Sequence, residues 1–116
     1  MPLPAAMALR AVKLVHTAIW LFFVCCILGI FLSTAGARFG WATGLSGVVL
    51  MECLVLVVNG GRCPLTDIAR NYSDDQSSNF DIYLPIWLAH YNKWIFGVLF
   101  ATAELYLLLR RTRLLP

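Results

Sequence analysis

The stretch that decides the fold is LVHTAIWLFFVCCILGIFL, residues 14–32. It carries no charged residue, and with the small residues that follow it the uncharged run extends from after Lys13 to before Arg38. Because a helix crosses the hydrocarbon core of a bilayer with about 20 apolar residues, this run predicts a transmembrane helix over about residues 12–34. A cleaved signal peptide is the alternative, but its apolar core is usually only about 7–15 residues long.

Two further apolar runs follow the first. Residues 39–61 contain a single charged residue, Glu52. Residues 82–109 contain two, Lys93 and Glu104. Charges this sparse over such lengths indicate two more membrane-spanning helices.

These runs predict transmembrane helices over about residues 41–60 and 86–109, separated by a polar loop over about 61–82. Pro64 suits the first position of a helix and predicts a short interfacial helix within that loop. We therefore expect an all-α integral membrane protein with three transmembrane helices, forming a single domain over residues 1–116.

The start of the third helix has two interpretations. Trp87, Tyr91 and Trp94 form an aromatic belt of the kind found at membrane–water interfaces. Either a long tilted helix begins near Ile86, or residues 82–92 lie along the interface before the chain turns inward. We favour the long helix.

Composition agrees with a membrane protein. Of the 116 residues, 60% are hydrophobic and 13% are charged, against roughly 45–50% and 25% in soluble proteins. So few charges do not cover a soluble globule of this size. The composition argues against a soluble enzyme, a disordered tail and a nucleic-acid binder, and it favours a multi-pass protein of the cell membrane.

The orientation in the membrane is not decided by charge. The positive-inside rule counts lysine and arginine next to the spans, and a three-span topology leaves both sides basic. We lean towards a cytoplasmic N-terminus. One side carries Arg10, Lys13, Arg62, Arg70 and Lys93, and the other carries Arg38, Arg110, Arg111 and Arg113.

Small residues gather in the first half of the second helix. Gly40 and Gly44 form a GxxxG pattern, and the pairs Ala42/Ser46 and Thr43/Gly47 repeat its four-residue spacing. Small residues at this spacing allow two helix backbones to approach closely in lipid. We expect these glycines to pack against the first helix or against another subunit.

Two histidines lie at comparable depth in the predicted topology. His16 is about one turn into the first helix and His90 about one turn into the third, and both helices enter from the same side. A pair of histidines on neighbouring helices is the minimum set for axial ligation of haem b. The simpler interpretation is that each histidine hydrogen-bonds a carbonyl, a water or a lipid head group.

Cys63 and Asp81 are predicted on the same side of the membrane as His16 and His90. Together the four side chains offer a ligand set for zinc or copper, although no spacing motif supports it. Alternatively, Cys63 caps or packs beside Pro64. A thiol oxidoreductase using Cys63 is a further alternative that lacks the usual second cysteine.

Two acidic residues lie within the predicted spans, where an unpaired charge is costly. Glu52 falls near mid-membrane, where it either relays protons or makes a structural hydrogen bond, for example to Thr17 or Ser46. Glu104 lies nearer the far side, within reach of the arginines that end the third helix.

The order of these features resembles a family of small bacterial membrane proteins to which no activity is assigned. The resemblance rests on His16, on Glu52, on the Cys-Pro-Leu-Thr box at residues 63–66 and on His90, and it covers roughly residues 14–109. The Glu52 position departs from the pattern, because it lies farther before the box than expected. The resemblance implies the architecture and a bacterial inner-membrane location, but no chemistry.

The expected role is therefore a structural or accessory membrane protein. Enzymatic activity stays open but is not favoured, since no nucleophile–base pair or phosphate-binding loop is evident. Its expected partners are the lipid bilayer and either a second copy or a larger membrane complex. The alternative is a membrane electron carrier that binds haem b through His16 and His90.

Overall fold

The computed structural model describes residues 4–73 and 79–114, and within these ranges it is helical with no strand. Residues 74–78 of the predicted polar loop lie outside the described residues. Three of the helices are long and apolar enough to cross a membrane, which confirms the predicted all-α fold with three such helices. The four helices are α1 (Ala5–Ala35), α2 (Phe39–Val58), α3 (Pro64–Arg70) and α4 (Ile86–Arg111).

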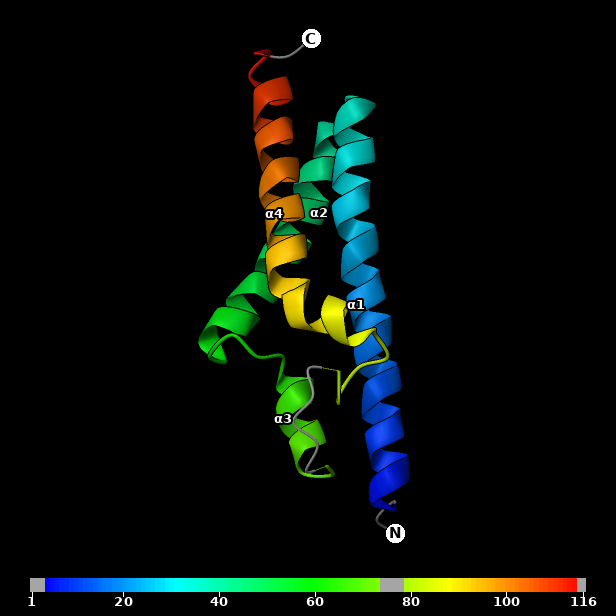
Figure 1. Cartoon of the computed structure of the whole chain (residues 1–116). Coiled ribbons are helices and arrows are strands. Elements are labelled where there is room, and N and C mark those ends of the chain that lie inside the picture. The colour runs from blue at the N-terminus through cyan, green and yellow to red at the C-terminus, as the bar shows by residue number, and fades with distance from the viewer. Residues whose placement is uncertain (1–3, 74–78, 115–116) are drawn as a thin grey trace.

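The three long helices form an elongated bundle with overall dimensions of 55 × 28 × 24 Å. Figure 1 shows α1 running along the whole bundle, α4 beside it, α2 crossing behind, and α3 below the lower end of α2. Helix α1 contacts each of the other three helices. The end of α1, the start of α2 and the end of α4 therefore share one end of the bundle, and α3 lies towards the other (Figure 1).

Helix α2 ends in a Schellman motif. The N–H of Gly61 donates to the carbonyl of Leu56, and the N–H of Gly60 donates to that of Val57. Gly60 has a φ of 71°, a conformation that glycine adopts without steric cost. The other two long helices end with a non-glycine residue in the same left-handed region, Ala37 (φ 58°) and Arg113 (φ 64°).

The first helix begins earlier than the expected residue 12, at Ala5. Its extra turns consist mainly of alanine, leucine, methionine and arginine, which are strong helix formers. Helix α4 runs from Ile86 to Arg111, against an expected 86–109. Figure 1 shows that the first turns of α4 lead away from α1. The rest of α4 then changes direction and runs alongside α1.

A small apolar core holds α1, α2 and α4 together. Gly29 brings α1 and α2 close, because a Cβ added there would lie 2.9 Å from the Leu45 Cδ1 atom. Trp20 packs edge-on against Phe96 with ring centroids 5.5 Å apart, joining α1 to α4. The buried core side chains are Cys26, Ile27, Ile30, Val49 and Ala103.

Candidate functional site

Asp81 connects two helices that are far apart in sequence. The Thr66 hydroxyl on α3 donates a short hydrogen bond to the Asp81 carboxylate. The His16 Nδ1 atom on α1 lies 3.1 Å from the Asp81 backbone oxygen and 3.5 Å from its Oδ2 atom. The Asp81 side chain is 7% exposed and that of His16 is 15% exposed. We call His16, Thr66 and Asp81 the Asp81 cluster.

The chain around Asp81 is held by its neighbours in sequence. Phe80, Ile82 and Leu84 are all buried, so apolar contacts fix the backbone on both sides of the carboxylate. The Asn79 side-chain amide donates to the Leu84 carbonyl at 2.9 Å, which closes the segment into a compact turn. A buried carboxylate is thereby placed beside α1 just before α4 begins.

Thr17 fastens the same segment to α1. Its hydroxyl accepts a hydrogen bond from the Tyr83 backbone N–H at 3.0 Å and donates one to the Lys13 carbonyl at 2.7 Å. The Lys13 Nζ atom lies 4.5 Å from the centroid of the Tyr83 ring, within the range of a cation–π contact. These contacts restrict the position of the neighbouring His16 ring.

The geometry determines the proton arrangement of His16. A backbone carbonyl only accepts hydrogen bonds, so the Nδ1 atom that faces the Asp81 oxygen carries the hydrogen. In the neutral ring the Nε2 atom then holds the lone pair. The Glu52 carboxyl on α2 also interacts electrostatically with His16. Asp81 is the acidic residue that the structure places beside the imidazole.

Cys63 immediately precedes α3 and is half-buried. Burial raises the pKa of the Cys63 thiol, the Leu65 and Thr66 amides oppose the rise, and the carboxylates of Glu52 and Asp81 add to it. Thiol chemistry needs the thiolate, which a raised pKa disfavours near neutral pH. All four cysteines are free. The surroundings of Cys63 therefore give the oxidoreductase interpretation no support.

His90 lies apart from the Asp81 cluster. It is exposed, and its ring packs against Tyr91 with centroids 4.7 Å apart. The Trp20 indole N–H on α1 donates to the Asn92 Oδ1 atom at 2.8 Å, so Asn92 marks the side of α4 that faces α1. His90 lies about 200° around the helix from Asn92. Haem b binding by His16 and His90 stays a prediction.

The predicted metal ligands are brought together only in part. Among residues 4–73 and 79–114, no group of three or more His, Cys, Asp or Glu side chains is placed to hold a metal ion. His16 and Asp81 meet, Cys63 interacts with Asp81 electrostatically, and His90 is exposed elsewhere on α4. Thr66 and Thr17 belong to the site but were not predicted as site residues. The only signal for Thr66 is its place in the Cys-Pro-Leu-Thr box.

The two acidic residues of the long helices have different surroundings. Glu52 is half-buried on α2 and interacts electrostatically with His16. The Thr17 and Ser46 hydroxyls expected to donate to it are instead bonded to carbonyls of their own helices, those of Lys13 and Ala42. Neither hydroxyl therefore donates to Glu52.

The Glu104 Oε1 atom is buried and has no hydrogen-bond partner within the described residues. The two arginines expected to reach it bind elsewhere: Arg110 donates to the Thr34 and Ala35 carbonyls, and Arg111 donates to the Thr43 hydroxyl. These arginines close the end of the bundle rather than neutralise the carboxyl.

Helix α2 carries small residues on two faces, and only one of them packs within the chain. Ala42 and Ser46 are buried at 0% and 5% exposure. A Cβ added to any glycine of the GxxxG pattern, or to Gly47, would meet nothing within 4 Å. The glycines therefore do not pack against α1, and the expectation that they contact the first helix is wrong. We call Gly40, Gly44 and Gly47 the outer face of α2.

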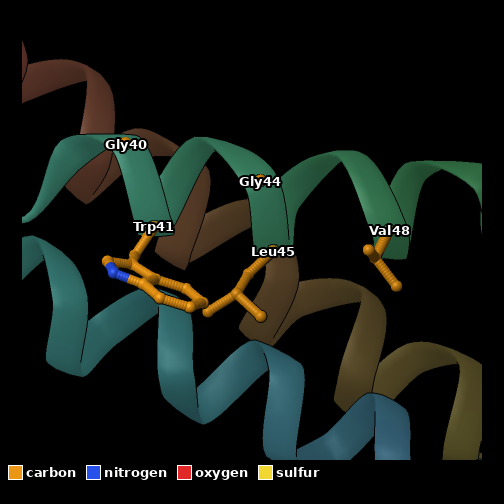
Figure 2. Close-up of a pocket in the computed structure, with 5 residues that line it drawn as sticks. All are labelled: Gly40, Trp41, Gly44, Leu45 and Val48. Atoms are coloured by element: carbon orange, nitrogen blue, oxygen red, sulfur yellow. The ribbon is translucent and has the colours of Figure 1, made fainter.

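An open hollow of about 450 Å³ borders this outer face. Figure 2 shows bare backbone at the two glycines, with the side chains beside them directed towards α1. Trp41 is 68% exposed at the rim. The lining is apolar in chemistry and consists of Gly40, Trp41, Gly44, Leu45 and Val48.

Comparison of the chain with protein families, with curated proteins and with solved structures finds no match. The resemblance to the family of small bacterial membrane proteins therefore stays a prediction.

Proposed function

We propose that the protein is an accessory subunit of the bacterial inner membrane that self-associates in the bilayer through the outer face of α2. In this arrangement α1, α2 and α4 span the membrane, and α3 lies at its surface. The partly exposed Asp67 and the exposed Arg70, next to a buried Ala69, suit α3 to that boundary. The Asp81 cluster then sits at the same surface and ties α3 and the start of α4 to α1.

The observation that carries the proposal is the open space beside Gly40, Gly44 and Gly47. A glycine within a helix costs about 0.5–1 kcal/mol relative to alanine. Close packing within the described residues gives no reason for these three glycines, because a Cβ added to any of them would meet nothing within 4 Å. A second helix that approaches along this face would gain the contacts that glycine permits in lipid.

A second copy of the chain is the occupant we favour. A GxxxG face is complementary to itself across a two-fold axis, as symmetric dimers require. The hollow beside the face continues the same apolar surface and is rimmed by the exposed Trp41 side chain. A partner helix therefore finds both a bare backbone and an aromatic edge to pack against.

Energy transfer between donor- and acceptor-labelled copies in lipid vesicles tests the proposal. Fluorescent domains fused to the C-terminus avoid altering the native cysteines. We expect transfer for the natural chain and its loss in Gly44→Ile, whose added side chain enters the open face without meeting the rest of the monomer. Gly97→Ile is the matched control, because Gly97 also has nothing within 4 Å but lies on α4.

The control should retain the transfer of the natural chain. The proposal fails if the natural chain shows no transfer at protein-to-lipid ratios where a known dimer does. It also fails if Gly44→Ile and Gly97→Ile behave alike. Helical content measured by circular dichroism verifies that both variants are folded.

A further inference from the structure

Four arginines collect at the end of the bundle where α1 and α4 end and α2 begins (Figure 1). No acidic residue occurs in residues 33–43 or 105–114, the segments that form this end. We call this set the arginine end. Its members are Arg38, Arg110, Arg111 and Arg113.

Two of these arginines are held by neutral groups. The Arg110 Nη1 atom donates to the Thr34 carbonyl at 2.9 Å and to the Ala35 carbonyl at 2.8 Å. The Arg111 Nη1 atom donates to the Thr43 hydroxyl at 2.7 Å. These contacts fix the guanidinium groups in place without cancelling their charge.

The remaining two arginines are exposed, and the backbone adds to the positive potential. Arg38 is the N-cap of α2, with no side-chain hydrogen bond at the cap and no acidic residue in the first turn. The first N–H groups of a helix lack partners within the helix and carry a partial positive charge. They point towards the same end as Arg38 and Arg113.

Buried donor capacity at this end is also unused. The Arg110 Nε atom and the Thr34 hydroxyl are buried and have no hydrogen-bond partner among the described residues. Thr34 is fully buried at 0% exposure. Both atoms are buried, so the donors that an incoming phosphate meets are the exposed guanidinium groups of Arg38, Arg111 and Arg113.

The opposite end of the bundle is different. There the Arg62 Nε atom lies 3.2 Å from the Asp67 Oδ1 atom, and Asp81 lies beside His16. Basic groups at that end are interspersed with carboxylates, so its field is weaker. The positive charge of the molecule is concentrated at the arginine end.

We propose that the arginine end binds the phosphate of an anionic phospholipid. The inference rests on the proposal that the three long helices span a bilayer, because only then does this end meet head groups. It does not depend on self-association through α2. Juxtamembrane arginines attract anionic lipid head groups, and guanidinium groups match phosphate oxygens in a bidentate geometry.

Native mass spectrometry of the full chain tests this inference. The protein is released from micelles that contain equal amounts of phosphatidylglycerol and phosphatidylcholine, and the retained lipids are counted. We expect the natural chain to retain phosphatidylglycerol in preference. The double variant Arg38→Gln/Arg113→Gln should lower the ratio of retained phosphatidylglycerol to retained phosphatidylcholine by about thirtyfold.

The matched control is Arg10→Gln/Arg70→Gln, which removes the same charge from the opposite end. It should retain the natural preference for phosphatidylglycerol. Equal retention of both lipids by the natural chain would overturn the inference without any variant. An equal loss of preference in both double variants would overturn it as well, because the effect would then be one of net charge. Neither result bears on the energy-transfer experiment, so the two proposals fail separately.

Discussion

Replacing Asp81 by alanine should open the junction between α1, α3 and the start of α4. The carboxylate accepts the Thr66 hydroxyl bond and lies 3.5 Å from the His16 Nδ1 atom. Alanine removes both side-chain contacts and leaves a donor without its partner. The backbone carbonyl of residue 81 remains available to His16, so the His16 ring loses only its contact with the carboxylate.

The size of the effect follows from the burial of the carboxylate. A hydrogen bond to a charged group contributes about 1.5–3 kcal/mol, and a neutral bond about 0.5–1.5 kcal/mol. Because the Asp81 side chain is only 7% exposed, solvent replaces little of what is lost. We expect Asp81→Ala to cost about 2 kcal/mol of unfolding free energy, and Asp81→Asn, which keeps an acceptor oxygen, about half of that.

The assay is unfolding in mixed micelles with increasing SDS, followed by circular dichroism. A double-mutant cycle with His16→Ala isolates the contact between the two side chains. Groups in direct contact usually couple by about 0.5–3 kcal/mol. We expect a coupling at the lower end of this range, since His16 keeps its bond to the backbone oxygen.

Asp67 provides the matched control, because it pairs with Arg62 and accepts a hydrogen bond from the Asn59 side-chain amide, but its side chain is 41% exposed. Exposed ion pairs contribute about 0–1 kcal/mol, so Asp67→Ala should cost clearly less than Asp81→Ala. Equal costs for the two variants, or a coupling of zero between His16 and Asp81, would refute the assignment of Asp81 as the residue that joins these elements.

Two further predictions concern packing and a thiol. Gly29→Val should cost about 1 kcal/mol in the same unfolding assay, the lower end of the range for overpacking, because its Cβ would lie 2.9 Å from the Leu45 Cδ1 atom, the flexible end of that side chain; a loss of several kcal/mol would contradict this ready displacement of Leu45. Alkylation of Cys63, followed by peptide mass mapping, should need a higher pH than alkylation of the same residue in the SDS-unfolded chain, because burial raises the pKa of its thiol. The stability linked to this neutral thiol is present below the pKa of the unfolded chain and is lost as the pH rises through the higher folded value; identical pH profiles for the folded and unfolded chains would contradict the burial.

The extent of the long helices is largely a local property. The uncharged run after Lys13 predicts the first helix from length and hydropathy alone, and Gly60-Gly61 provides the left-handed residues on which the second helix ends. Hydropathy did not predict the residue at which α1 begins. Hydropathy marks the apolar segment, whereas strong helix formers carry α1 beyond it to Ala5.

The candidate site was partly within reach of the sequence. His16 and Asp81 were both candidate metal ligands because they are predicted on the same side of the membrane. Their pairing depends on a turn in which Phe80 and Ile82 are buried, and no spacing in the sequence encodes that contact. The pairing of His16 with His90 was suggested by equal depth, but depth does not specify which side of a helix faces its neighbour.

The sequence by itself determined that this chain forms three long apolar helices and carries two rows of small residues on the second. Only the tertiary structure decided that the Ala42 and Ser46 row packs inside and that Gly40 and Gly44 remain open. The physical reason is that lipid chains are as apolar as the protein core, so hydropathy does not distinguish a buried helix face from a lipid-facing one. That choice is made by the fit of side chains between helices, as where Leu45 of α2 lies against Gly29 of α1.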